Sequence, residues 1–149
     1  MSVARTFLLL LLAALAAGCA LEENEDDHAA GAAVKQVLER EYFGDYRAAW
    51  DTLHPRHQRF VTREEYEECR RGIDVEGTIE SVLVLDVHDE PLTVYGLPPR
   101  TPSKAVEVRV TTDENEFTAT YHVVRVGDQW RWVLSDRAAR GFARTDCPE

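Results

Sequence analysis

Residues 29–72 carry apolar side chains at helical spacing, which predicts a helical start to the folded part of the chain. The first stripe is apolar except for one charge and consists of Val34, Val37, Leu38, Glu41 and Tyr42. These positions follow the i, i+3, i+4, i+7 pattern of one helix face. Gly44 breaks this helix, and Asp45 is placed to cap the next one.

The second and third helices have recognisable ends. The second helix has an apolar face formed by Tyr46, Ala49, Trp50 and Leu53. Pro55 ends it, because proline lacks the amide that a helix interior requires. In the third helix, Thr62 and Glu65 have the spacing of a capping box, in which each side chain bonds to the backbone amide of the other residue. Gly72 is a typical residue for the end of a helix.

Beyond Gly72 the apolar period changes from helical spacing to alternation, which predicts β-strands. The predicted inward faces are Ile79, Leu83, Leu85 and Val87; Val106, Val108 and Val110; Phe117, Ala119, Tyr121 and Val123; and Trp130, Trp132 and Leu134. Gly127-Asp128 predicts a tight hairpin, and the proline-rich stretch from Pro91 to Pro102 predicts a loop or an edge segment. Helices followed by strands indicate an α+β domain with N-terminal helices packed on a strongly curved antiparallel sheet.

The composition narrows the classes of function. The chain has 149 residues, of which 44% are hydrophobic and 30% charged. These values suit one globular domain with a tail and exclude a multi-span membrane protein. The formal net charge of −10 repels a phosphate backbone, so we expect no nucleic-acid partner.

The beginning of the chain has the form of an export signal. The unbroken apolar stretch from Phe7 to Ala17 is shorter than the about 20 residues that a membrane-spanning helix needs. The sequence Leu15-Ala16-Ala17-Gly18-Cys19 resembles the lipobox of bacterial lipoproteins. That resemblance implies cleavage before Cys19, attachment of lipid such as palmitate to this residue, and an exported protein held at the extracytoplasmic face of the cell membrane. The alternative is an ordinary secretory signal in which Cys19 is incidental.

An acidic run follows Cys19. Residues 22–27 contain five acids in six positions, and such a run stays solvated and extended because it has no apolar surface to bury. We interpret it as a spacer that holds the domain away from an anionic membrane, rather than as a cation site, because nothing nearby fixes ligand geometry. The expected organisation is a signal peptide over residues 1–18, a lipid-anchored acidic linker over residues 19–28 and one domain over residues 29–149.

Local motifs in this domain carry a family resemblance. They are Gly44-Asp45-Tyr46-Arg47-Ala48-Ala49-Trp50, Thr62-Arg63-Glu64-Glu65-Tyr66 and Gly127-Asp128-Gln129-Trp130-Arg131-Trp132. With the helix before them, they resemble the nuclear transport factor 2-like superfamily, and more narrowly the small actinobacterial lipoproteins built on its fold. The resemblance covers about residues 29–145 and implies a cone fold, in which helices and a curved sheet enclose a pocket. Because the superfamily includes isomerases, cyclases, dehydratases and protein-binding adaptors, the fold leaves the function open.

An enzyme of this fold needs an acid or a base inside the cone. The candidates are Asp86, His88, His122 and Tyr121. Asp86 and His122 fall on strand faces opposite the apolar positions, and His88 lies beside a turn, so we expect these side chains to point away from the interior. Tyr121 is expected to be a core residue. We therefore predict no catalytic residues.

The segment His54-Pro55-Arg56-His57 places two histidines three residues apart, which is a spacing that metal ligands on one helix face use. Pro55 interrupts the helix, however, and no Cys or carboxylate follows at ligand spacing. We interpret this segment as a surface turn, and we expect neither a metal nor another cofactor.

Together these observations predict a non-catalytic binding or interaction module, anchored by lipid at the cell envelope. Its partner would be an envelope protein or an apolar small molecule. The candidate pocket-lining residues are Trp50, Phe60, Tyr66, Tyr121 and Trp132. The alternatives are a small cone-fold enzyme of the isomerase, cyclase or dehydratase type acting on an apolar substrate, and a structural accessory that docks on a cell-wall enzyme. Two interior ionisable groups within hydrogen-bond reach would favour the enzyme, and a closed, aromatic-filled cone would favour the structural role.

With Cys19 assigned to lipid, Cys69 and Cys147 remain as an even pair in an exported, oxidising setting. Cys69 lies one turn beyond Tyr66 on the inner face of the third helix, and Cys147 lies beyond the last strand. We predict a disulfide between them, which fastens the tail to the third helix; the alternative is two unrelated thiols.

Overall fold

The computed structural model describes residues 25–73 and 77–148. The predicted signal peptide, Cys19 and the linker up to residue 24 lie outside these ranges. The elements are a long helix over residues 25–42, α2 (Tyr46–Asp51), α3 (Arg63–Arg71), β1 (Ile79–Asp89), β2 (Lys104–Thr112), β3 (Glu116–Val126), β4 (Gln129–Trp132) and α4 (Asp136–Ala143). This confirms the predicted α+β class. No helix among the described residues is long and apolar enough to cross a membrane.

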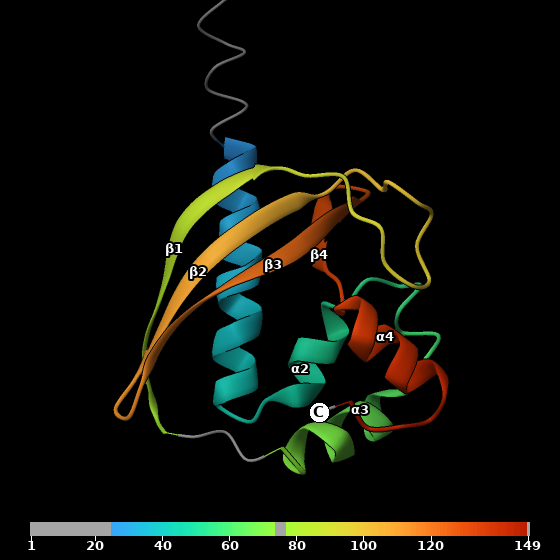
Figure 1. The fold of residues 1–149 in the computed structure, drawn as a ribbon, viewed down its shortest axis with the longest axis horizontal. Coiled ribbons are helices and arrows are strands. Elements are labelled where there is room, and N and C mark those ends of the chain that lie inside the picture. Colours follow the sequence, from blue (N-terminus) through green and yellow to red (C-terminus); the bar gives the residue numbers. More distant parts are fainter. Residues whose placement is uncertain (1–24, 74–76, 149) are drawn as a thin grey trace, which may run out of the picture.

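The strands form one antiparallel sheet in the order β1-β2-β3-β4. The sheet curves around the long helix, and α2, α3 and α4 lie together beside that helix, away from β1 (Figure 1). Gly127 and Asp128 form the turn between β3 and β4, as predicted. The stretch from Pro91 to Pro102 is a loop, apart from an isolated bridge between Leu92 and Thr101.

The apolar core has two parts. The first lies between the long helix and the sheet and includes Val34, Leu38, Val82, Val106, Val108, Val110 and Val123. The second lies among α2, α3, α4 and the loop after β1 and includes Ala49, Leu53, Val61, Tyr66, Val94, Leu134, Ala139 and Phe142. Trp132 packs against both parts, so the end of β4 joins the sheet to the smaller helices.

The inward face predicted for β1 is wrong at two positions. Leu83 is 53% exposed and Leu85 is 38% exposed, whereas Val82 and Val84 pack into the core. The cause is a pair of register shifts in the pairing with β2, which flank residues 81–84. Each shift inserts one residue and thereby exchanges the two faces of the strand.

The long helix already includes residues 25–28, so the expectation of an extended chain up to residue 28 is wrong for these four residues. Asp26 forms an ion pair with Arg125, and Asp27 Oδ1 lies 2.7 Å from Lys104 Nζ. These acids therefore fasten the helix to the sheet instead of acting as a spacer.

The predicted helix caps are present. The Thr62 side chain accepts a hydrogen bond from the Glu65 amide, and the Thr62 amide donates to Glu65 Oε2 at 2.9 Å, which completes the capping box. Asp45 accepts from the Ala48 amide at the start of α2. Gly72 ends α3 with a φ of −77°, so this helix stops without a left-handed residue.

The sequence pattern did not predict α4. Ser135 caps this helix by accepting from the Ala138 amide, and Asp136 lies in its first turn. Its buried residues are Ala139, Gly141 and Phe142, which pack toward the second part of the core. The segment was missed because it has only eight residues and Phe142 is its one large apolar side chain.

Candidate functional site

A cavity of about 630 Å³ lies between the long helix, β3, α3 and α4. Its apolar lining includes Val34, Val37, Leu38, Tyr121, Trp132 and Phe142. Residues 92–94 of the loop after β1 and Pro148, which follows α4, add further parts of the wall. The long helix contributes the same stripe that its periodicity identified, so this stripe faces both the sheet and the cavity.

One wall of the cavity is polar. Glu41 on the long helix is only 8% exposed and lies opposite Tyr66 and Arg70, which are one turn apart on α3. The Tyr66 hydroxyl donates to Glu41 Oε1, and Arg70 Nη2 forms an ion pair with Glu41 Oε2. Both oxygens of the buried carboxylate therefore have a partner.

The electrostatics of this cluster fix the protonation of its members. Burial, reinforced by the Glu41 carboxylate, raises the pKa of Tyr66 far above its ordinary value, so the phenol stays protonated and donates. Burial opposes the charge on Arg70, but Glu41 and Tyr66 outweigh this effect and raise the pKa of the guanidinium. A charged Arg70 thus balances Glu41 inside the wall.

Two further hydroxyls lie on the cavity wall. Burial raises the pKa of Tyr42, on the long helix, and of Tyr121, on β3. Both phenols therefore remain neutral at physiological pH and present hydroxyl groups beside an otherwise apolar space.

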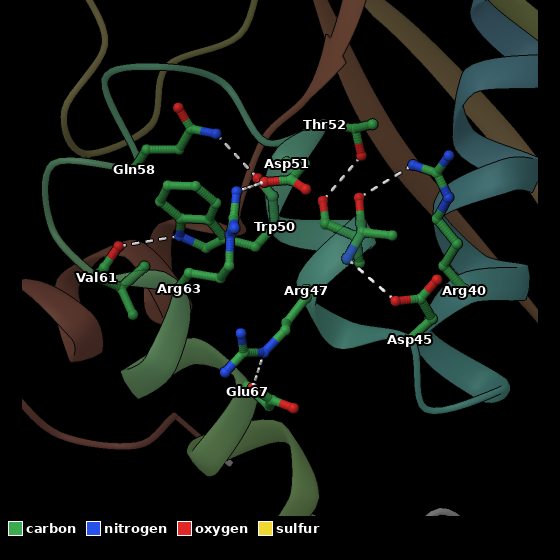
Figure 2. Close-up of polar contacts among 12 residues, drawn as sticks. Arg40, Asp45, Arg47, Trp50, Asp51, Thr52, Gln58, Val61, Arg63 and Glu67 are labelled. Atoms are coloured by element: carbon green, nitrogen blue, oxygen red, sulfur yellow. Dashed lines mark hydrogen bonds and ion pairs between the residues drawn. The ribbon is translucent and has the colours of Figure 1, made fainter.

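The structure separates the five predicted pocket residues into two groups. Tyr66, Tyr121 and Trp132 line the cavity. Trp50 does not: its Nε1 donates to the Val61 carbonyl at 3.0 Å and its ring lies under Arg63, on the outer side of α2 (Figure 2).

Phe60 also lies away from the cavity. Its ring packs beside that of Tyr95, with centroids 5.3 Å apart, and against Gly96. A Cβ on Gly96 would lie 2.4 Å from the Phe60 ring, so only glycine allows this contact. The aromatic stripe predicted a core position for Phe60 but had no means of separating core from cavity.

The polar candidates on the strands are placed as follows. Asp86 and His88 are exposed, and Asp86 Oδ2 lies 2.7 Å from His88 Nδ1. His122 was expected to point away from the interior, but its side chain is only 21% exposed and it borders the cavity. Its cross-strand neighbour in the register is the buried Ala105, and its Nε2 lies 3.4 Å from Glu90 Oε2.

The surface position expected for the two histidines after α2 is wrong. His57 is completely buried and His54 is 9% exposed. His57 Nδ1 accepts from the Leu134 amide at 3.0 Å, and its Nε2 lies 3.0 Å from the Tyr95 carbonyl, to which it donates. The imidazole thus satisfies two backbone groups of distant segments. Burial lowers its pKa from 6.5 to about 4. Within residues 25–73 and 77–148, no group of three His, Cys, Asp or Glu side chains is arranged to hold a metal ion.

Cys69 and Cys147 form the disulfide that the sequence predicted, with Cα atoms 5.3 Å apart. The bond joins the segment after α4 to α3, beside the polar wall. The Glu41 cluster itself was missed by the sequence reasoning. Its signal was present as the one charge within the apolar stripe of the first helix.

Comparison of the chain with protein-family models, with curated protein sequences and with solved structures gives no match.

Proposed function

We propose that this protein is an exported lipoprotein whose domain binds a small, mainly apolar molecule without changing it chemically. The observation that carries the proposal is the cavity of about 630 Å³. Ligand pockets typically measure about 300–1,000 Å³ and combine apolar walls with a few placed polar groups. Valine, leucine and aromatic side chains form most of this wall, and Arg70 with the tyrosine hydroxyls forms a polar patch on one side.

The polar patch favours binding over catalysis. A general base needs a lone pair that reaches the substrate. Both Glu41 oxygens are occupied by Tyr66 and Arg70, and the raised pKa of Tyr66 keeps its proton in place. The Tyr66 hydroxyl is committed to Glu41, so the donors that the patch offers a ligand are the Tyr42 and Tyr121 hydroxyls and the remaining N–H groups of Arg70.

An enzyme is the second candidate, and one observation favours it. Glu41, Tyr66 and Arg70 are interior ionisable groups within hydrogen-bond reach of one another. If a substrate displaced Tyr66 or Arg70 from the carboxylate, Glu41 would become available as a base. This candidate requires a rearrangement of the cluster, whereas binding does not.

The finer description of the fold belongs to the same proposal. A long helix crossed by a curved antiparallel sheet, with a partly open cavity between them, supports the cone fold of the nuclear transport factor 2-like superfamily. The cavity also argues against the purely structural role, because a closed, aromatic-filled interior would leave no such space.

The envelope location rests on the lipobox-like sequence that ends at Cys19. The Cys69–Cys147 disulfide supports an oxidising compartment. Since the long helix is already formed at residue 25, a lipid on Cys19 would hold the cavity-bearing domain within a few residues of the membrane surface. An apolar ligand would then be taken from, or delivered to, that membrane.

The binding test uses N-phenyl-1-naphthylamine, a neutral apolar fluorophore, and the mature chain that starts at residue 19 and carries Cys19→Ala, so that neither the apolar stretch Phe7–Ala17 nor a bound lipid competes. We expect saturable binding with one site per chain. Thr93→Trp, at an exposed position of the cavity wall, should weaken it at least tenfold. Thr118→Trp, an equally exposed position outside the lining, is the matched control. Absence of saturable binding, or equal loss in both variants, would contradict the proposal.

The enzyme candidate is tested by mass spectrometry of small molecules that copurify with the protein. A binding protein releases the same molecule from wild type and from Glu41→Gln. An enzyme would yield product from wild type and unconverted substrate from the variant.

A further inference from the structure

We infer that the segment after α4, clamped by the Cys69–Cys147 disulfide, is a fixed wall of the cavity and that Pro148 limits the size of the ligand. The inference rests on the proposed function and identifies what determines its specificity. It assigns the disulfide to the binding site as well as to the stability of the fold.

The first support is the position of the clamp. Cys69 lies on α3 directly before Arg70 and one turn after Tyr66, and both of these neighbours line the cavity. Its partner Cys147 directly precedes Pro148, which also lines the cavity. The disulfide therefore holds Pro148 beside the helix that supplies the polar wall.

The second support is the path of the chain between α4 and the clamp. Thr145 has a φ of 63°, in the left-handed region, and the Asp146 amide donates to the Gly141 carbonyl at 3.0 Å. This turn sends the chain back along α4. A Cβ on Gly141 would lie 3.2 Å from Pro148 Cβ, so the absence of a side chain allows the proline to rest directly on the helix.

These contacts make the wall rigid. The pyrrolidine ring fixes φ, and the neighbouring disulfide fixes the position of the preceding residue. Pro148 is thus held by α3 through the disulfide and by α4 through Gly141. A ligand that is too large meets this wall and has no flexible segment to displace.

The test measures a series of straight-chain alkyl methyl esters that displace N-phenyl-1-naphthylamine from the mature chain that starts at residue 19 and carries Cys19→Ala. Each buried methylene strengthens binding about fourfold until the chain reaches a wall, after which the affinity stops rising. Two variants remove the wall in different ways. Pro148→Gly leaves the disulfide intact, and Cys69→Ser with Cys147→Ser releases the whole segment. Pro98→Gly, in the exposed loop outside the lining, is the control.

We expect both variants to move the chain-length limit by two or more methylenes. The ester two methylenes beyond the wild-type limit should then bind about 15-fold more tightly to the variants than to wild type or to Pro98→Gly. If the esters bind but Pro148→Gly keeps the wild-type limit, the inference about the wall is refuted and the binding function stands. If neither the fluorophore nor any ester binds to the wild-type cavity, the proposed function fails as well.

Discussion

His57 should make the stability of this domain depend on pH from about pH 6.5 downward, so that the loss begins above the range in which carboxylates titrate. Its imidazole is completely buried and bonds two backbone groups that lie far apart in the sequence, the Tyr95 carbonyl and the Leu134 amide. Protonation gives Nδ1 a hydrogen, so this nitrogen would lose its bond from the Leu134 amide. Burial therefore lowers the pKa to about 4 in the folded state, against 6.5 for an unperturbed histidine.

The sign and size of the effect follow from proton linkage. Because the folded-state pKa lies below the unfolded value, the unfolded chain binds more protons between pH 6.5 and 4. The stabilising effect of keeping His57 neutral is complete above pH 6.5 and is lost as the pH falls toward 4. Between pH 7 and pH 5 the free energy of unfolding should fall by about 2 kcal/mol through this residue alone.

Urea unfolding at half-unit steps from pH 7 to pH 5, followed by circular dichroism, measures this loss. The His57→Gln variant is less stable at pH 7, since it breaks at least one of the two bonds, but its stability should change much less with pH. His54, whose pKa is also lowered by burial, contributes to the remaining slope. Thr118→Ala, a change at an exposed, non-titrating position of β3, should keep the wild-type slope.

The test compares how steeply the free energy of unfolding changes with pH in the two proteins, and not how stable each protein is at one pH. If wild type and His57→Gln lose the same free energy of unfolding between pH 7 and pH 5, the buried imidazole does not titrate as argued. The assignment of a neutral His57 bonded at both nitrogens would then be wrong.

The remaining predictions concern the disulfide, the anchor and the third helix. Cys147→Ser should lower the free energy of unfolding by about 4 kcal/mol, since the bond closes a loop of 78 residues; equal urea midpoints for the variant and oxidised wild type would contradict this. Cys19→Ala should move the protein from the membrane to the soluble fraction and abolish incorporation of labelled palmitate; a variant that stays with the membrane, together with a wild type that incorporates no labelled palmitate, would refute lipid attachment at this residue. Thr62→Ala removes the capping box and should lower the free energy of unfolding by about 1 kcal/mol, which lowers the urea midpoint. Thr118→Ala, on an exposed strand face, should leave the urea midpoint nearly unchanged.

The apolar pattern of the sequence predicted only part of the cavity lining. The stripe on the first helix and the aromatic positions Tyr66, Tyr121 and Trp132 were identified as candidates, because apolar periodicity reports which face turns inward. The same criterion also selected Trp50 and Phe60, which pack elsewhere. An inward face is shared by core and cavity, and only the three-dimensional arrangement separates them.

The polar cluster illustrates the opposite failure. Glu41 was visible as a charge in an apolar stripe, but nothing in the sequence named Arg70 as its partner. The two residues are on different helices, and their meeting depends on how α3 crosses the long helix. The burial of His57 also depends on contacts between distant segments, because its ring bonds the Tyr95 carbonyl and the Leu134 amide.

The features that the sequence determined by itself involve residues close together in the chain, or, for the disulfide, only the number of cysteines. The caps at Asp45 and Thr62 act within one turn, the turn at Gly127 acts within a hairpin, and the disulfide followed from the count of cysteines left after Cys19. The tertiary structure decided the rest. Bulges in β1 exchange the strand faces because the pairing with β2 sets the register, and the acids at residues 26 and 27 join a helix because Arg125 and Lys104 lie opposite them. These outcomes depend on contacts between residues far apart in the chain, which a pattern read along the sequence does not contain.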